Sequence, residues 1–162
     1  KLPVLILEDG SSIYDSRFIL EYLECMYPQT PLLSSEVLER LVAKKLEVLA
    51  DGICDAVVLL FFERMRGEHA SAEWTARQVH KIEGGVRELA RLIEKRQFAV
   101  GDQFGLADIA VGAALGYLKV RFTDFDWQAL YPSLANYSTN LEQRPSFQST
   151  QPYPQTITDK VV

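Results

Sequence analysis

The chain has 162 residues and a hydrophobic content of 48%, enough for one ordinary domain with a core of its own. Its formal net charge of −5 argues against nucleic acid as a partner. The sequence contains no apolar run of about 18 residues, the length that a membrane-spanning helix requires. We therefore expect no membrane partner.

The cysteines and histidines indicate neither a disulfide nor a metal site. Cys25 and Cys54 are far apart, form no Cys-x-x-Cys motif and fall in helical patterns. We expect two reduced thiols in a hydrophobic core, which is consistent with a cytoplasmic protein. His69 and His80 have no partner at metal-ligand spacing, so no metal is expected.

Residues 1–28 predict a β-hairpin followed by a helix. Residues 4–7 are a continuous apolar run, which is typical of a strand covered on both faces. Asp9-Gly10 predicts a two-residue turn of type I′, with residues 11–14 as the returning strand. Asp15 or Ser16 then caps the helix. Because an isolated hairpin is only marginally stable, this order implies missing strands on the N-terminal side.

The rest of the chain predicts helices only. Residues 29–35 resemble a linker, and residues 151–162 lack periodicity and predict a surface tail. Between them, apolar periodicity predicts an all-helical region whose main helices cover residues 36–66, 72–96, 106–120 and 132–143. The helix over 106–120 is apolar nearly all round, as a central helix is. We expect the helix over 36–66 to bury a set of apolar side chains: Leu38, Leu41, Val42, Leu49, Ile53, Val57, Leu60 and Phe61.

Asp15-Ser16 has two interpretations. Aspartate and serine are favoured helix caps, and the pair needs no other role. Alternatively, the free backbone N–H groups and the dipole of this helix N-terminus attract a carboxylate, to which Ser16 adds its hydroxyl. Asp15 beside it can accept from an ammonium group. An α-amino acid end carries both groups a short distance apart, so such a ligand fits the second interpretation.

Residues 104–109 predict the start of the central helix. Gly105 stands where a capping box usually has a hydroxyl residue, and Asp108 can reach back to the Gly105 N–H. Phe104 and Ile109 have the spacing of a hydrophobic staple. We assign this motif to folding and give it no catalytic role.

The chain resembles a bacterial, cytosolic-type glutathione S-transferase that lacks its first β-α-β segment. The resemblance is carried by Leu2-Pro3 before the apolar strand, by the hairpin, by Asp15-Ser16 and by the motif at 104–109. The resemblance covers residues 1 to about 150. It implies an α+β fold: the C-terminal half of a thioredoxin-like domain (1–28), a linker (29–35) and an all-α C-terminal domain (36–150).

The resemblance also implies a site. Pro3 alone could be a trans proline at the first residue of a strand, but the family carries a cis proline there. Glutathione would bind to the backbone of Leu2 beside Pro3, to Asp15 and Ser16 through its γ-glutamyl end, and to Lys1 through its glycine carboxylate. In the family, the helix over 36–66 faces both the partner subunit and the active-site crevice.

Three further residues are candidates for an electrophile pocket. Asp51 and Asp55 either lie on a solvated face of the helix over 36–66 or line the crevice. Tyr117 on the central helix either belongs to the core or lines the pocket for the hydrophobic substrate.

The activity that the resemblance implies is conjugation of glutathione to small hydrophobic electrophiles. The catalytic Ser, Tyr or Cys would stand in the absent N-terminal segment, so no catalytic side chain is expected in this sequence. The alternatives are a non-catalytic interaction scaffold and a glutathione-dependent thiol reductase or peroxidase. We expect a cytoplasmic homodimer in which the hairpin edge and the first helix contact the partner's long helix near residues 46–60.

Overall fold

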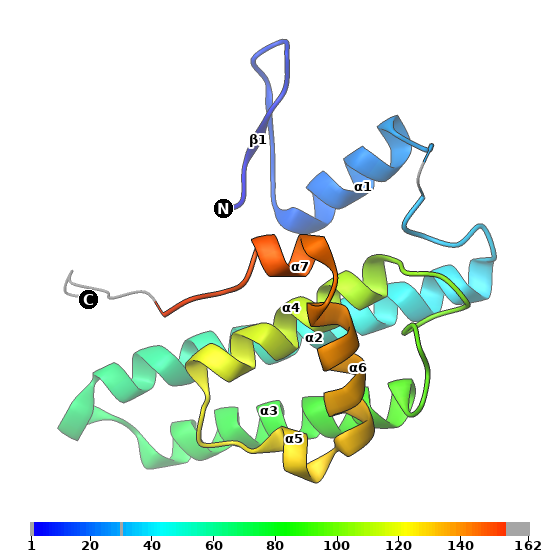
Figure 1. Cartoon of the computed structure of the whole chain (residues 1–162). Helices are drawn as coiled ribbons and strands as arrows, with labels where there is room; N and C mark the ends of the chain where they lie inside the picture. Colours follow the sequence, from blue (N-terminus) through cyan, green and yellow to red (C-terminus); the bar gives the residue numbers. More distant parts are fainter. Residues whose placement is uncertain (1, 30, 155–162) are drawn as a thin grey trace.

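The computed structural model describes residues 2–29 and 31–154, in which a β-hairpin and one helix stand over a bundle of helices (Figure 1). Strands β1 (Leu5–Ile6) and β2 (Ser12–Ile13) pair antiparallel, with Leu5 opposite Ile13. Both strands are shorter than predicted. Val4 is 43% exposed and Ile6 63% exposed, so the expected cover on both faces is absent from the described part of the chain, where these two strands are the whole sheet.

The hairpin turn is not the predicted two-residue turn of type I′. Residues 8–10 form a three-residue loop, closed by a bond of 3.0 Å from the Gly10 N–H to the Leu7 carbonyl. Gly10 has a φ of +82°, but Asp9 has no positive φ, and a type I′ turn needs both. Asp9 instead accepts from the Ser11 N–H at 2.9 Å and from the Ser11 hydroxyl at 2.6 Å. These bonds lower the Asp9 pKa and hold the wider loop.

Helix α1 (Ser16–Met26) begins where the sequence predicts. Asp15 is its N-cap and accepts from the Arg17 N–H at 3.2 Å. At the other end, the Glu24 carboxylate accepts from the Leu32 N–H at 3.0 Å and from the Leu33 N–H at 2.9 Å. Leu33 belongs to the hydrophobic core, so the segment predicted as a linker is packed against the bundle.

The predicted long helices are confirmed as α2 (Val37–Met65), α3 (Ala72–Ile93) and α4 (Leu106–Arg121), and the shorter one as α6 (Pro132–Glu142). Helix α2 packs against both α3 and α4, and α6 against both α3 and α4. The sequence pattern also predicts that a further turn begins at residues 145–149, and α7 (Pro145–Ser149) confirms it. It does not predict η1 (Gly67–His69) or α5 (Trp127–Leu130), because one turn carries no periodicity.

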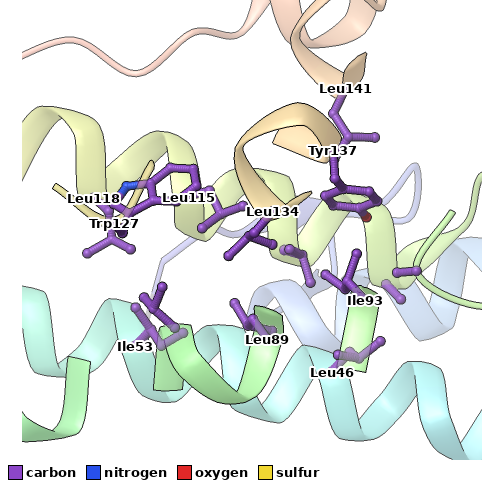
Figure 2. Close-up of a cluster of buried hydrophobic side chains, with 14 of the residues drawn as sticks. Leu46, Ile53, Leu89, Ile93, Leu115, Leu118, Trp127, Leu134, Tyr137 and Leu141 are labelled. Carbon is purple, nitrogen blue, oxygen red and sulfur yellow. The ribbon is translucent and has the colours of Figure 1, made fainter. Parts of the chain in front are cut away.

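The hydrophobic core lies where α2, α3, α4 and α6 meet (Figure 2). Each helix supplies large side chains that are almost fully buried, and α5 adds Trp127. Residues shown in Figure 2 from this cluster are Leu46, Ile53, Leu89, Ile93, Leu115, Leu118, Leu134, Tyr137 and Leu141. The prediction for α4 as a central, largely buried helix is confirmed.

The predicted buried face of α2 is partly wrong. Ile53 and the two apolar residues four and seven positions after it are buried as expected. In contrast, Leu38 is 77% exposed, Leu41 61% and Val42 42%. Helix α2 carries apolar residues on more than one face, and among the described residues its buried side chains lie on the face toward α3 and α4. None of the helices in residues 2–29 and 31–154 combines the length and apolar character that crossing a membrane requires.

Candidate functional site

Two segments of the predicted site lie at the same end of the hairpin. Leu2-Pro3 precedes β1 and Asp15-Ser16 follows β2, so the antiparallel pairing of the two strands puts both segments at the open end of the hairpin. The Leu2-Pro3 peptide bond is cis, as the family resemblance implies. Leu2 is 87% exposed, so its backbone is accessible to a ligand. Lys1, the remaining predicted glutathione contact, lies outside the described residues.

The N-terminus of α1 is built to receive a negative group. Ser16 is the first residue of the helix and is exposed, and Asp15 caps it from the preceding position. The backbone N–H groups of a first helical turn and the helix dipole favour a carboxylate there. The Ser16 hydroxyl can donate to the same group, and the Asp15 carboxylate can accept from an ammonium beside it. An α-amino acid end therefore matches this chemistry.

Asp51 does not lie free on a crevice wall. Its Oδ2 accepts from the Arg17 Nε at 2.6 Å and lies 2.5 Å from the second guanidinium nitrogen, Nη2. This bond and the charge of Asp51 raise the pKa of Arg17. Asp55, one turn further along α2, is exposed. Arg17 thus links Asp51 to the first turn of α1, a contact that the sequence does not predict.

Tyr117 is half-buried and packs against the hydrophobic core, which favours the first of its two interpretations. An apolar cavity of about 510 Å³ lies between α4 and α7, but Tyr117 is not among the residues that line it. Gly112 forms part of its wall, and a Cβ atom there would collide with the Phe147 ring. Glycine at this position therefore allows α7 to lie close against α4. A charged pair, Lys119 with Glu142, adds a polar element to the otherwise apolar wall.

The capping carboxylate of α4 does more than the sequence predicts. Asp108 accepts from the Gly105 N–H at 2.8 Å, as expected, and also from the Ala99 N–H at 2.8 Å and from the Tyr137 hydroxyl at 2.6 Å. Asp108 is only 1% exposed. Burial and the neighbouring Asp108 raise the pKa of Tyr137, so the hydroxyl stays protonated and acts as a donor. This cluster joins the 99–105 loop, α4 and α6, and its role is structural.

The two thiols differ from each other and from the prediction. Cys25 is exposed rather than in the core, because α1 buries none of its residues. Cys54 is half-buried, and burial together with Asp51 and Asp55 raises its pKa to about 11. A thiol with such a pKa is a poor nucleophile at neutral pH. Within the described residues, no three side chains of His, Cys, Asp or Glu come together in a group that could hold a metal ion.

Residues 72–140 match the family model described as "Glutathione S-transferase, C-terminal domain". The chain is 35% identical over 153 residues to the uncharacterized GST-like protein YibF of Escherichia coli. The aligned region covers 94% of this chain and 75% of that protein. It is 32% identical over 129 residues to a maleylacetoacetate isomerase of Pseudomonas aeruginosa, covering 75% of this chain and 58% of the isomerase.

Among solved structures, a glutathione S-transferase from Methylobacterium radiotolerans, crystallised with glutathione sulfonate, superposes with a TM-score of 0.97. It is 56% identical in sequence, and the match covers 100% of this chain and 77% of that one. The likeness therefore includes the hairpin, α1 and the whole bundle as described above. This chain belongs to the glutathione S-transferase family.

Proposed function

We propose that the whole protein is a glutathione S-transferase that conjugates glutathione to small hydrophobic electrophiles. The observation that carries the proposal is the exposed N-terminus of α1, where Asp15 and Ser16 offer complementary contacts to the γ-glutamyl end of glutathione. The relative crystallised with glutathione sulfonate supports it, because its match to this chain includes α1. A cytoplasmic location agrees with the free cysteines.

In this proposal, each part of glutathione has its own contact. The γ-glutamyl carboxylate binds to the first turn of α1 and to the Ser16 hydroxyl, and its ammonium to Asp15. The backbone of Leu2 pairs with the cysteinyl part in the manner of an added strand. Lys1 meets the glycine carboxylate. The catalytic Ser, Tyr or Cys is supplied by residues that precede Lys1 in the whole protein, and the electrophile lies toward α2 and α4, where Asp55 and Tyr117 stand.

A second candidate reaction uses the same glutathione site. The Pseudomonas relative is named a maleylacetoacetate isomerase, so a glutathione-dependent isomerisation is the alternative that a specific likeness favours. A thiol reductase or peroxidase requires a cysteine as the catalytic residue. Cys54 does not fit that role, because its raised pKa keeps the thiol protonated.

The assay that separates these activities uses the full-length protein. We expect glutathione-dependent conjugation of 1-chloro-2,4-dinitrobenzene, followed by absorbance, at a rate well above the uncatalysed reaction. Maleylacetoacetate and hydroxyethyl disulfide, tested with the same enzyme, report isomerase and reductase activity. Binding of glutathione without turnover of any of the three substrates would favour the interaction scaffold instead.

We also propose a homodimer, with a contact surface that differs from the first expectation. Leu46, Ile53, Val57 and Leu60 of α2 lie in the core of their own chain and cannot meet a partner. The same helix also carries exposed apolar side chains along its length, which we define as the apolar stripe: Leu38, Leu41, Val48 and Leu59. Such a stripe is an aggregation liability unless another surface covers it, and a twofold dimer would do so.

Leu41→Glu is expected to convert the dimer to a monomer, because it places a charge in the middle of the stripe. Light scattering of the full-length protein at micromolar concentration measures the mass. Leu130→Glu is the matched control: Leu130 is 62% exposed, similar to Leu41 at 61%, but lies on α5, away from the stripe. A monomeric wild type, or a dimer that survives Leu41→Glu, would contradict this interface.

A further inference from the structure

A second cavity, of about 620 Å³, lies where α1 is connected to α2. Its walls are the C-terminal end of α1, residues 31–35, the first turns of α2 and the loop before α4, which lie together at one end of the bundle (Figure 1). Its volume is within the range of cavities that bind small molecules. Cys25 lines it, and about 14 Å of helix separates Cys25 from Ser16. The cavity is therefore separate from the proposed glutathione site.

Hydrogen bonds hold the walls of this cavity in place. The Glu24 carboxylate accepts from the Leu32 N–H at 3.0 Å, and the Leu32 carbonyl accepts from the Leu106 N–H at 2.9 Å. Asp108, which also lines the cavity, holds the loop before α4 by accepting from the Ala99 N–H at 2.8 Å. The cavity is therefore preformed, and a ligand would not have to order its walls on binding.

The charged side chains of the wall are mostly acidic. Within the described residues, one cation, Arg40, lines the cavity, and it is paired at 2.9 Å with Glu21, which is not part of the wall. Four carboxylates line the cavity: Glu24, Glu39, Asp102 and Asp108. Two of these four, at positions 24 and 108, accept from backbone donors of the protein itself. The other two supply the negative charge that a ligand would meet.

Glu39 has the carboxylate that is best placed for a ligand. It is half-buried near the start of α2 and lies against Gly101, where a Cβ atom would be 3.3 Å from the Glu39 Oε2. Gly101 has a φ of +61°, which glycine adopts at little cost, and its lack of a side chain leaves room for the carboxylate. In the part of the chain that the structure describes, the Glu39 carboxylate has neither a hydrogen-bond partner nor an ion-pair partner. A partly desolvated carboxylate of this kind favours a cation beside it.

Apolar side chains form the other part of the wall. Pro28 follows α1, Leu33 belongs to the hydrophobic core, and Val100 and Phe104 belong to the loop before α4. Such side chains bind an aliphatic or aromatic group because contact removes its apolar surface from water. Together with the Glu39 carboxylate, they fit a molecule that has an apolar body and one positive group.

We infer that this cavity is a non-catalytic binding site for a small protonated amine with an aliphatic or aromatic body, whose ammonium group donates to the Glu39 carboxylate while its body lies against the apolar wall. Asp102 adds negative charge at the exposed side of the site. This inference goes beyond the proposed function and does not depend on it. Because Cys25 is exposed and lines the cavity, the reactivity of its thiol reports whether the cavity is occupied.

The test is titration calorimetry of the full-length protein with tryptamine, an aromatic amine that is protonated at neutral pH, in the presence of saturating glutathione. Glu39→Gln is expected to weaken tryptamine binding about tenfold, between the values for an exposed ion pair and for a hydrogen bond to a charged group. Tryptophol has the same indole with a neutral hydroxyl in place of the ammonium. It should bind the wild type about tenfold more weakly than tryptamine.

Glu36→Gln is the matched control. Glu36 is exposed directly before α2, three positions from Glu39, and does not line the cavity. Its replacement should leave tryptamine affinity at the wild-type value. Alkylation by iodoacetamide gives a second readout, followed by mass spectrometry of the peptides that carry the two thiols. Saturating tryptamine should slow alkylation of Cys25 several-fold and leave that of Cys54, which is not part of the wall, unchanged.

Three results would overturn the inference. If tryptamine does not bind, the cavity is not an amine site. Equal affinity for tryptamine and tryptophol would show that the site does not recognise charge. Tryptamine binding that is unaffected by Glu39→Gln, or that leaves Cys25 unprotected, would place the amine elsewhere on the protein. Failure to bind glutathione in a separate titration would count against the proposed function alone.

Discussion

Replacing Asp108 with alanine is expected to lower the free energy of unfolding by about 3–5 kcal/mol. The carboxylate accepts three hydrogen bonds, from the Ala99 N–H, the Gly105 N–H and the Tyr137 hydroxyl, and it is 1% exposed. Alanine would leave these donors without an acceptor, two of them in the interior, and each such donor costs about 1–3 kcal/mol. Urea unfolding of the full-length protein, followed by circular dichroism, measures the loss.

Two further variants make this prediction specific. Tyr137→Phe removes one donor and leaves Asp108 with its two backbone partners, so a smaller loss of about 1 kcal/mol is expected. Asp102→Ala removes an exposed carboxylate from the same loop and should change the free energy of unfolding by less than about 0.5 kcal/mol. A loss below about 1 kcal/mol for Asp108→Ala would show that the cluster contributes little to stability.

Replacing Ser16 with alanine is expected to weaken glutathione binding by about 1–3 kcal/mol, the range for a hydrogen bond to a charged group. Ser16 is exposed at the first position of α1, and its hydroxyl has no structural role that alanine would disturb, since Asp15 is the residue that caps the helix. The helix itself should therefore remain intact. Titration calorimetry of the full-length protein with glutathione gives the affinity directly.

Ser133→Ala is a suitable control for this experiment. Ser133 is also exposed in the first turn of a helix, α6, but it lies on another side of the molecule. Its replacement should leave glutathione affinity at the wild-type value. Equal affinity of Ser16→Ala and wild type would remove Ser16 from the proposed site, even if the protein binds glutathione.

The helices were predictable because each one repeats its apolar residues over several turns. The three long helices of the bundle begin and end within a few residues of the expected positions. The type of turn at Asp9-Gly10 was not predictable, since the same dipeptide also fits the three-residue loop that the structure adopts. The exposed start of α2 was also missed, because apolar periodicity does not tell which of two apolar faces another element covers.

In the candidate site, too, local features were predictable from the sequence and long-range contacts were not. Asp15 and Ser16 were predictable because a helix cap is a local feature of neighbouring residues. The contact of Asp51 with Arg17 spans 34 positions, and that of Tyr137 with Asp108 spans 29. Neither pairing is encoded in a short motif. Each depends on how the helices pack, which a single sequence does not show.

A row of ion pairs joins α1 to α2, Arg17 with Asp51 and Glu21 with Arg40 and Lys44, and we call this row the charged seam. It has a consequence for directed evolution of this protein. Interdigitated apolar side chains would couple the angle of α1 to the packing of the whole core, so that most changes of angle would lower stability. The pairs of Glu21 with Arg40 and Lys44 are partly exposed, and substitutions in such pairs cost little free energy. Exchanges of charge along the seam can therefore shift α1 while the core stays as it is. Libraries that vary the seam would sample new placements of α1 without a prior search for stabilising mutations.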